Sequence, residues 1–275
     1  MSLKLAAIVP HPPLLVPAIG KENLLRLENT KKAYDKIAAS LREEKIETIL
    51  LISSHGPLNP DAWQINIGAE FNIDFEEFGE FTARASVSGD LELAQNIRED
   101  LIELPTVRAI NETKLDHGCS VPLFSLLVGS RPGEIKPKND KNISLVPFYI
   151  SGAGLPEHFA LGKKIRSRLV KGRKKIAVLA SGDLSHTLAK NSPAGFAPRS
   201  AKFDQKIISC LIEKKIDEFL NLEEELIREA KPCGLRAIAL LLGILDGNAY
   251  DVETSAYESP FGIGYLSLLF KPLPT

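Results

Sequence analysis

The chain has 275 residues, of which 44% are hydrophobic and 25% charged, and its 34 Lys and Arg against 35 Asp and Glu give a formal net charge of −1. This composition is typical of a globular protein, and it excludes a wholly disordered chain and a strongly basic nucleic-acid-binding protein. The long apolar stretch at residues 237–245 falls short of the about 20 residues that a membrane-spanning helix needs. We therefore expect neither a nucleic-acid partner nor a membrane partner.

Short apolar runs alternate with helical patterns along the chain. Short, mainly apolar runs predict strands at residues 5–9, 48–52, 64–69, 83–87, 143–150, 176–180 and 265–270. Helical spacing of apolar residues predicts one amphipathic helix or a broken pair at residues 22–44, and further helices at 90–103, 120–128, 156–170 and within 202–245. Residues 131–142 are rich in Pro, Gly and Lys, which predicts a surface loop.

This order of elements predicts the fold class. A strand, a helix and a second strand at this spacing form a parallel crossover unit, and such units build a sheet that is covered on both faces. We predict a three-layer α/β fold with a central, mostly parallel sheet and helices on both faces. With no internal repeat and no low-complexity segment, residues 1–275 are expected to form a single domain.

The cysteines and the N-terminus indicate the compartment. Cys119, Cys210 and Cys233 are an odd number of widely spaced cysteines, so they support neither a disulfide framework nor a zinc knuckle. The apolar N-terminal run is interrupted at His11 and no small-residue cleavage site follows, which argues against a signal peptide. We expect a cytoplasmic protein in which Cys119 and Cys210 are small core residues.

Three of the five histidines follow predicted strands. His11, His55 and His186 each lie shortly after the C-terminal end of a buried strand. In an open α/β sheet these ends converge on one crevice where ligands bind. Each histidine alone is better explained as a polar residue of a loop or turn, but the three together predict a site for a metal ion or for proton transfer. His117, before a predicted helix, is a fourth candidate, whereas His158 is expected to be an exposed helix residue.

Other patterns are weaker. The turn at residues 151–154 lacks the spacing of a dinucleotide or phosphate loop, so we interpret it as structural. Ser181, Asp183 and His186 include the residue types of a hydrolase triad, but the chain has no Gly-x-Ser-x-Gly elbow around them. The basic cluster at residues 163–175 has no interleaved aromatic residues, which favours a solvated helix face over a nucleic-acid site.

Four short motifs in order carry a resemblance to a known family. They are His-Pro-Pro at residue 11, Ser-His-Gly at residue 54, Asp-His-Gly at residue 116 with Val-Pro-Leu soon after it, and Ser-Gly-Asp-Leu-Ser-His at residue 181. Together with the C-terminal segment 259–265 they resemble the catalytic branch of the class III extradiol ring-cleavage dioxygenases and the related Memo-like proteins. The resemblance extends over nearly the whole chain.

The resemblance implies a metal-dependent dioxygenase whose partners are a small catechol-like aromatic and O2. It implies non-haem Fe(II), with Zn or Cu as alternative metals, and a homodimer is one expected state because such relatives often associate. By motif, His11 and His55 would be metal ligands. His186 would be the acid and base residue that deprotonates the catechol, and His117 would contact substrate or oxygen.

The third metal ligand is open at this point. The dioxygenases take it from a Glu in the C-terminal region, for which Glu229 is a candidate. In the Memo-like branch a Cys before Gly approaches the metal, and Cys233 matches that position. His186 is a third alternative. A thiolate ligand favours softer metals, so the Memo-like alternative is a metal-binding protein with non-oxygenase chemistry or a non-catalytic binding role.

Overall fold

A computed structural model describes residues 2–57, 59–104, 106–128 and 143–273. Within these ranges the strands are β1 (Leu3–Val9), β2 (Thr48–Ser53), β3 (Trp63–Asn66), β4 (Glu70–Phe75), β5 (Glu80–Ser88), β6 (Val107–Ile110), β7 (Ser144–Tyr149), β8 (Ile176–Ser181), β9 (Tyr250–Glu258) and β10 (Tyr265–Pro272). The α-helices are α1 (Pro17–Gly20), α2 (Glu28–Glu43), α3 (Leu91–Asp100), α4 (His117–Leu123), α5 (Leu155–Lys171), α6 (Ser200–Ile212), α7 (Ile216–Leu220), α8 (Glu224–Ala230) and α9 (Leu235–Leu245). Short 3-10 turns η1 (Pro13–Leu15), η2 (Lys21–Leu27) and η3 (Glu76–Phe78), and the π-helical turn η4 (Phe124–Val128), complete the described elements.

The central sheet has eight strands in the described residues, in the order β6-β3-β7-β2-β8-β1-β10-β9. The four central strands β7, β2, β8 and β1 run parallel to one another, while β10 and β9 add an antiparallel edge. On the other side β3 is antiparallel to β7, and β6 is parallel to β3. The strands β4 and β5 form a separate antiparallel pair. The parallel centre brings several strand ends to one edge.

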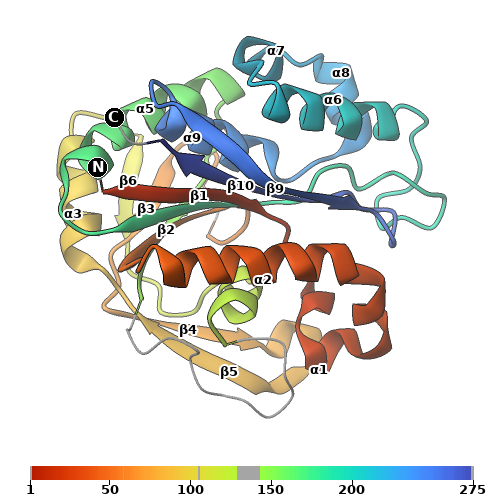
Figure 1. Ribbon diagram of the computed structural model, residues 1–275, viewed down its shortest axis with the longest axis horizontal. Helices are drawn as coiled ribbons and strands as arrows, with labels where there is room; N and C mark the ends of the chain where they lie inside the picture. Colours follow the sequence, from red (N-terminus) through yellow and green to blue (C-terminus); the bar gives the residue numbers. More distant parts are fainter. Residues whose placement is uncertain (1, 58, 105, 129–142, 274–275) are drawn as a thin grey trace.

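Both faces of the sheet are buried, which explains the continuous apolar runs of its central strands. In β1, Ala6 and Ile8 pack into a core with α3, α5, α6 and α9, whereas Leu5, Ala7 and Val9 pack into a second core with α2 and α4. Figure 1 shows α5 and α9 on one side of the sheet and α2 with the β4–β5 pair on the other. The predicted three-layer α/β fold is confirmed.

Most of the predicted elements are present, with shifted bounds. The broken-pair alternative for residues 22–44 is correct, because η2 precedes α2. The helix predicted at 120–128 begins earlier, at His117, and continues as the π-helical turn. The sequence interpretation missed β4, β6 and β9, and the predicted loop at 131–142 lies outside the described residues. None of the helices in the ranges described here is long and apolar enough to cross a membrane.

Candidate metal centre

Three neighbouring parallel strands end level with one another and carry the first site residues. The register pairs Val9 of β1 and Ser53 of β2 with the same residue of β8, Ser181. His11 and His55 each follow two residues after their strand, as Asp183 does after β8. The polar positions that the sequence placed at strand ends are therefore gathered at one edge of the sheet.

The imidazoles of His11 and His55 face one another next to a thiol. Their Nε2 atoms are 3.1 Å apart, and the Sγ of Cys233 is 3.6 Å from the Nε2 of His11. Two ligands of one tetrahedral zinc-like ion lie about 3.3 Å apart for two nitrogens and about 3.6 Å apart for nitrogen and sulfur, given the bond lengths these atoms make. The three ligand atoms lie within 4.8 Å of one another, so His11, His55 and Cys233 fit a single metal ion.

Ser181 orients the His11 ring. The hydroxyl of Ser181 donates to the carbonyl of Gly118, so it accepts a hydrogen bond from the Nδ1 of His11 at 2.9 Å. This bond fixes the proton on Nδ1 and leaves the Nε2 lone pair directed toward His55 and Cys233. Metal-binding histidines are commonly held in this way by a partner on the second ring nitrogen. The backbone N–H of His11 also donates to Asp183 Oδ1 at 3.0 Å.

A close backbone contact brings Cys233 to the sheet edge. A Cβ on Gly182 would lie 2.1 Å from the Cα of Gly234, so glycine is required where these segments meet. The N–H of Gly234 donates to the carbonyl of Asp183 at 2.9 Å, and the N–H of Asp183 donates to the Sγ of Cys233 at 3.1 Å. The loop after β8 and the residue before α9 therefore hold one another in place.

Burial sets the protonation of the three candidate ligands. Desolvation, with a smaller contribution from neighbouring histidines, lowers the pKa of His11 and of His55 to about 3, so both rings are neutral at physiological pH. Burial raises the pKa of the Cys233 thiol to about 12, and the nearby Asp183 carboxylate adds to this shift. The imidazoles therefore offer lone pairs directly, whereas the thiol must lose its proton when it binds a metal.

His117 lies on the more open side of the cluster formed by His11, His55 and Cys233. It is the first residue of α4, whose N-cap residue Asp116 accepts a hydrogen bond from the N–H of Cys119 at 3.2 Å. The His117 ring centroid is 4.3 Å from that of His55 and 5.3 Å from that of His11. Its Nδ1 lies 3.5 Å from a carboxylate oxygen of Glu77 in η3. His117 thus borders the space in front of the candidate ligands.

His186 forms a second group with Asp183 and Cys233, again with ligand atoms within 4.8 Å of one another. Its backbone N–H donates to the carbonyl of Ala230 at 2.8 Å, which fixes the loop. Its Nδ1 is buried and has no hydrogen-bond partner in the described part of the chain. This nitrogen is available for a metal ion, a substrate or a proton.

Glu229 lies elsewhere. Its two carboxylate oxygens each accept a hydrogen bond from Arg199 at 3.0 Å, one from Nε and one from Nη2. Among the described residues Glu229 belongs to neither metal-compatible group, although it lies four residues before Cys233. Of the three alternatives for a third ligand, the structure places Cys233 and His186 at the cluster and Glu229 on Arg199.

The prediction for His158 is wrong. Its ring is fully buried rather than exposed, because its Nδ1 bonds the carbonyl of Gly154 at 2.8 Å and the ring packs on Trp63 at 5.3 Å between centroids. Cys119 and Cys210 are core residues as predicted.

Three residues around the cluster were not recognised from the sequence in these roles. From the sequence, Ser181 is a candidate only as a nucleophile, Asp116 enters only as the first residue of the Asp-His-Gly motif, and Glu77 has no role. Asp116 had a usable signal, since Asp directly before a helix is a typical N-cap. Nothing in the local pattern connects Glu77 with His117, which lies 40 residues away.

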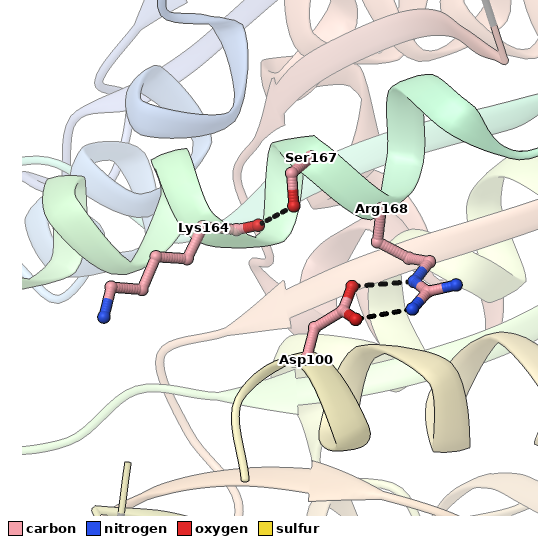
Figure 2. Close-up of a pocket in the computed structure, with 4 residues that line it drawn as sticks. All are labelled: Asp100, Lys164, Ser167 and Arg168. Carbon is pink, nitrogen blue, oxygen red and sulfur yellow. Dashed lines mark hydrogen bonds and ion pairs between the residues drawn. The ribbon is translucent and has the colours of Figure 1, made fainter. Parts of the chain in front are cut away.

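Two surface hollows have no histidine in their lining among the residues described. One is lined by α5 and α8 residues and by Cys233, but by none of the histidines among the residues described. The other lies between α3 and α5, where Figure 2 shows Arg168 paired with Asp100 through two hydrogen bonds, and Ser167 bonded to the carbonyl of Lys164. Lys163 of α5 also pairs with a carboxylate, that of Asp246, and both side chains are exposed, which agrees with a solvated helix face.

Residues 5–266 match the family described as the catalytic LigB subunit of aromatic ring-opening dioxygenase. The chain belongs to this LigB family. Because the match extends from β1 into β10, it includes every candidate ligand and both candidate catalytic histidines. The resemblance inferred from the motifs is confirmed, and the family implies a metal-dependent dioxygenase with a metal cofactor.

Individual relatives are distant. The chain is 28% identical to Protein CA_C1420 of Clostridium acetobutylicum over 96% of its own length, and it spans 57% of that protein. It is 27% identical to the 3,4-dihydroxyphenylacetate 2,3-dioxygenase of Escherichia coli, covering 90% of this chain and 92% of the relative. It is 25% identical to the 2-aminophenol 1,6-dioxygenase beta subunit of a Pseudomonas species, covering 81% and 78%. The crystal structure of the uncharacterized protein JW3007 from Escherichia coli K12 shares the fold, with a TM-score of 0.68, 19% identity and coverage of 97% and 99%.

Proposed function

We propose that this LigB-family protein is an extradiol dioxygenase that opens the ring of a catechol-type aromatic with O2, using iron(II). The observation that carries the proposal is the pair of Nε2 atoms of His11 and His55, 3.1 Å apart at the edge of the sheet. Two relatives are named as dioxygenases of 3,4-dihydroxyphenylacetate and of 2-aminophenol, and these names support a substrate ring with adjacent hydroxyl or amino groups.

His11, His55 and Cys233 would hold the ion. When bound, it would lower the pKa of a coordinated phenol and bring both reactants into one coordination sphere. His186 would accept the catechol proton at its unpartnered Nδ1 and return it later in the reaction, because no protein group competes for that nitrogen among the described residues. His117, on the open side of the cluster, would contact the substrate or oxygen.

One observation favours a second candidate function. Iron(II) oxygenases typically use two histidines and a carboxylate, whereas here the third group beside the two imidazoles is the Cys233 thiol. A thiolate suits zinc or copper(I) better than a carboxylate does. The second candidate is therefore a Memo-like metal-binding protein with non-oxygenase chemistry or a non-catalytic binding role.

A reconstitution experiment tests both functions. The protein is stripped of metal, loaded anaerobically with iron(II) and mixed with a panel of catechols and 2-aminophenols while O2 uptake and ring-opened products are measured. We expect uptake with at least one substrate, its loss in His55→Ala, and a rate lowered by about 10²- to 10⁴-fold in His186→Gln with iron still bound. Iron binding without turnover across the panel would overturn the dioxygenase function and favour the second candidate.

A further inference from the structure

The β4–β5 hairpin is attached to the segment that carries His117. The N–H of Asn72 in β4 donates to the carbonyl of Thr113, and the N–H of Leu115 donates to the carbonyl of Asn72. The turn η3 at the end of β4 therefore has a defined position next to the N-terminus of α4. Its residues Glu77 and Phe78 both contact the His117 ring, so the hairpin forms one wall of the space in front of the cluster.

Two acidic residues close to Glu77, one at the end of β4 and one in η3, pair with permanent cations. Asp74 pairs with Lys114 at 3.1 Å, and Glu76 pairs with Arg84 at 2.6 Å. Glu77 differs, because in the described part of the chain its only ion-pair contact is with His117, at 3.5 Å. Glu77 is about half exposed, so its charge also faces solvent and any ligand that enters beside His117.

The surroundings of the cluster add negative charge. Asp116 lies directly before His117, and Asp183 is buried beside His11. Within the ranges that the structure describes, no lysine or arginine forms an ion pair with Glu77, Asp116 or Asp183. Phe78 adds an apolar surface, since the residue is 37% exposed and its ring stands edge-on to His117 with 5.6 Å between centroids. This wall combines an aromatic surface with a carboxylate whose only ion-pair contact among the described residues is the His117 imidazole, while Lys114, which pairs with Asp74 and Glu76, acts on it from beyond ion-pair distance.

We propose that Glu77 selects the substrate by charge, so that the preferred aromatic carries an amine-bearing arm rather than a carboxylate-bearing one. This inference rests on the proposed function, because it takes a catechol ring bound at the cluster. The His117 ring lies between Glu77 and His55, so a short arm on a catechol ring bound at the cluster reaches η3. There the carboxylate would pair with an ammonium group and repel a carboxylate, while Phe78 contacts the ring irrespective of its charge.

The test measures binding without turnover. The protein is loaded with zinc, which is redox-inert, and two probes are titrated at low ionic strength by calorimetry: catechol with an aminoethyl arm, and 3,4-dihydroxyphenylacetate, which carries a carboxymethyl arm. We expect the aminoethyl probe to bind about threefold to tenfold more tightly, as one partly exposed charge pair allows. The preference should shrink as salt is added, because the charges are screened.

Three variants locate the effect. Glu77→Gln should bring the two affinities to within about twofold, by weakening the aminoethyl probe and strengthening the carboxymethyl probe. Glu76→Gln is the matched control, because it removes a charge one residue away that Arg84 already neutralises, and it should keep the wild-type ratio. Phe78→Ala should weaken both probes alike.

Equal binding of the two probes by the wild-type protein, or the same ratio in Glu77→Gln as in the wild type, would overturn the selection by Glu77 and leave the proposed function intact. If neither probe nor unsubstituted catechol binds to the zinc-loaded or the iron-loaded protein, the catechol substrate of the proposed function is wrong, and the inference fails with it.

Discussion

Two histidines of this protein are equally buried but differ in what their ring nitrogens do. His158 uses both: Nδ1 bonds the carbonyl of Gly154 at 2.8 Å, and Nε2 accepts the N–H of Ser151 at 3.4 Å. His11 uses Nδ1 on Ser181, while its Nε2 faces His55 and Cys233. Burial and a lowered pKa are common to both rings. The difference that indicates a metal site is therefore a lone pair directed at other ligand atoms, and burial alone does not indicate one.

The largest expected effect is the loss of metal affinity when the thiol of Cys233, which faces His11, is removed. Cys233→Ala should lower metal affinity by more than about 100-fold, because it removes one of three ligand atoms, whereas the loss of a supporting hydrogen bond costs about 10- to 100-fold. Glu229→Ala should leave metal affinity unchanged, since that carboxylate is bonded to Arg199. Competition titration with a chromophoric chelator measures both variants. The reverse result would show that Glu229 reaches the metal in solution.

A smaller loss is expected when the partner of His11 Nδ1 is removed. Ser181→Ala deletes the hydroxyl that fixes the proton on Nδ1, so zinc affinity should fall by about 10- to 100-fold. Ser267→Ala is the matched control, because Ser267 is also fully buried but its hydroxyl has no hydrogen-bond partner within the described residues. It should change neither zinc affinity nor the thermal midpoint appreciably. An unchanged affinity in Ser181→Ala would show that the cluster itself orients His11.

The sequence predicted the site residues at the ends of the strands better than those that distant segments bring to the site. His11 and His55 were recognisable because each follows a continuous apolar run, and a strand buried on both faces gives such a run. Their meeting follows from the parallel register, which sets Val9 and Ser53 level with Ser181. This part of the site is a consequence of sheet geometry.

Contacts between distant segments had no comparable signal. Cys233 reaches the cluster through the contact of Gly182 with Gly234, and Glu77 reaches His117 through the pairing of β4 with the segment before α4. Neither contact produces a periodic pattern of residues in the sequence that could have predicted it. The exposed position predicted for His158 failed for a related reason, because Trp63 of β3 covers that ring. The sequence could therefore leave Glu229, Cys233 and His186 as alternatives for the third ligand, but it could not choose among them.

The last comparison uses pH to separate His158 from the metal-binding cluster. Burial lowers the pKa of His158 to about 4 from an ordinary value of 6.5, so the unfolded chain binds a proton that the folded chain does not. Stability from this group is present above pH 6.5 and is lost as the pH falls toward 4. Between pH 7 and 5 the loss is about 2 kcal/mol. His158→Gln should be less stable at pH 7, but its unfolding free energy, measured in urea, should fall by about 2 kcal/mol less over this interval.

Zinc sharpens this last comparison. Saturating zinc binds the folded chain and raises its unfolding free energy, and the gain itself depends on pH because protons compete for His11, His55 and Cys233. The difference in acid dependence between wild type and His158→Gln should be the same with and without zinc, because both nitrogens of His158 are bonded within the protein. A difference that disappears when zinc is added would mean that the two buried histidines are coupled. Their separation into a structural and a metal-binding ring would then be wrong.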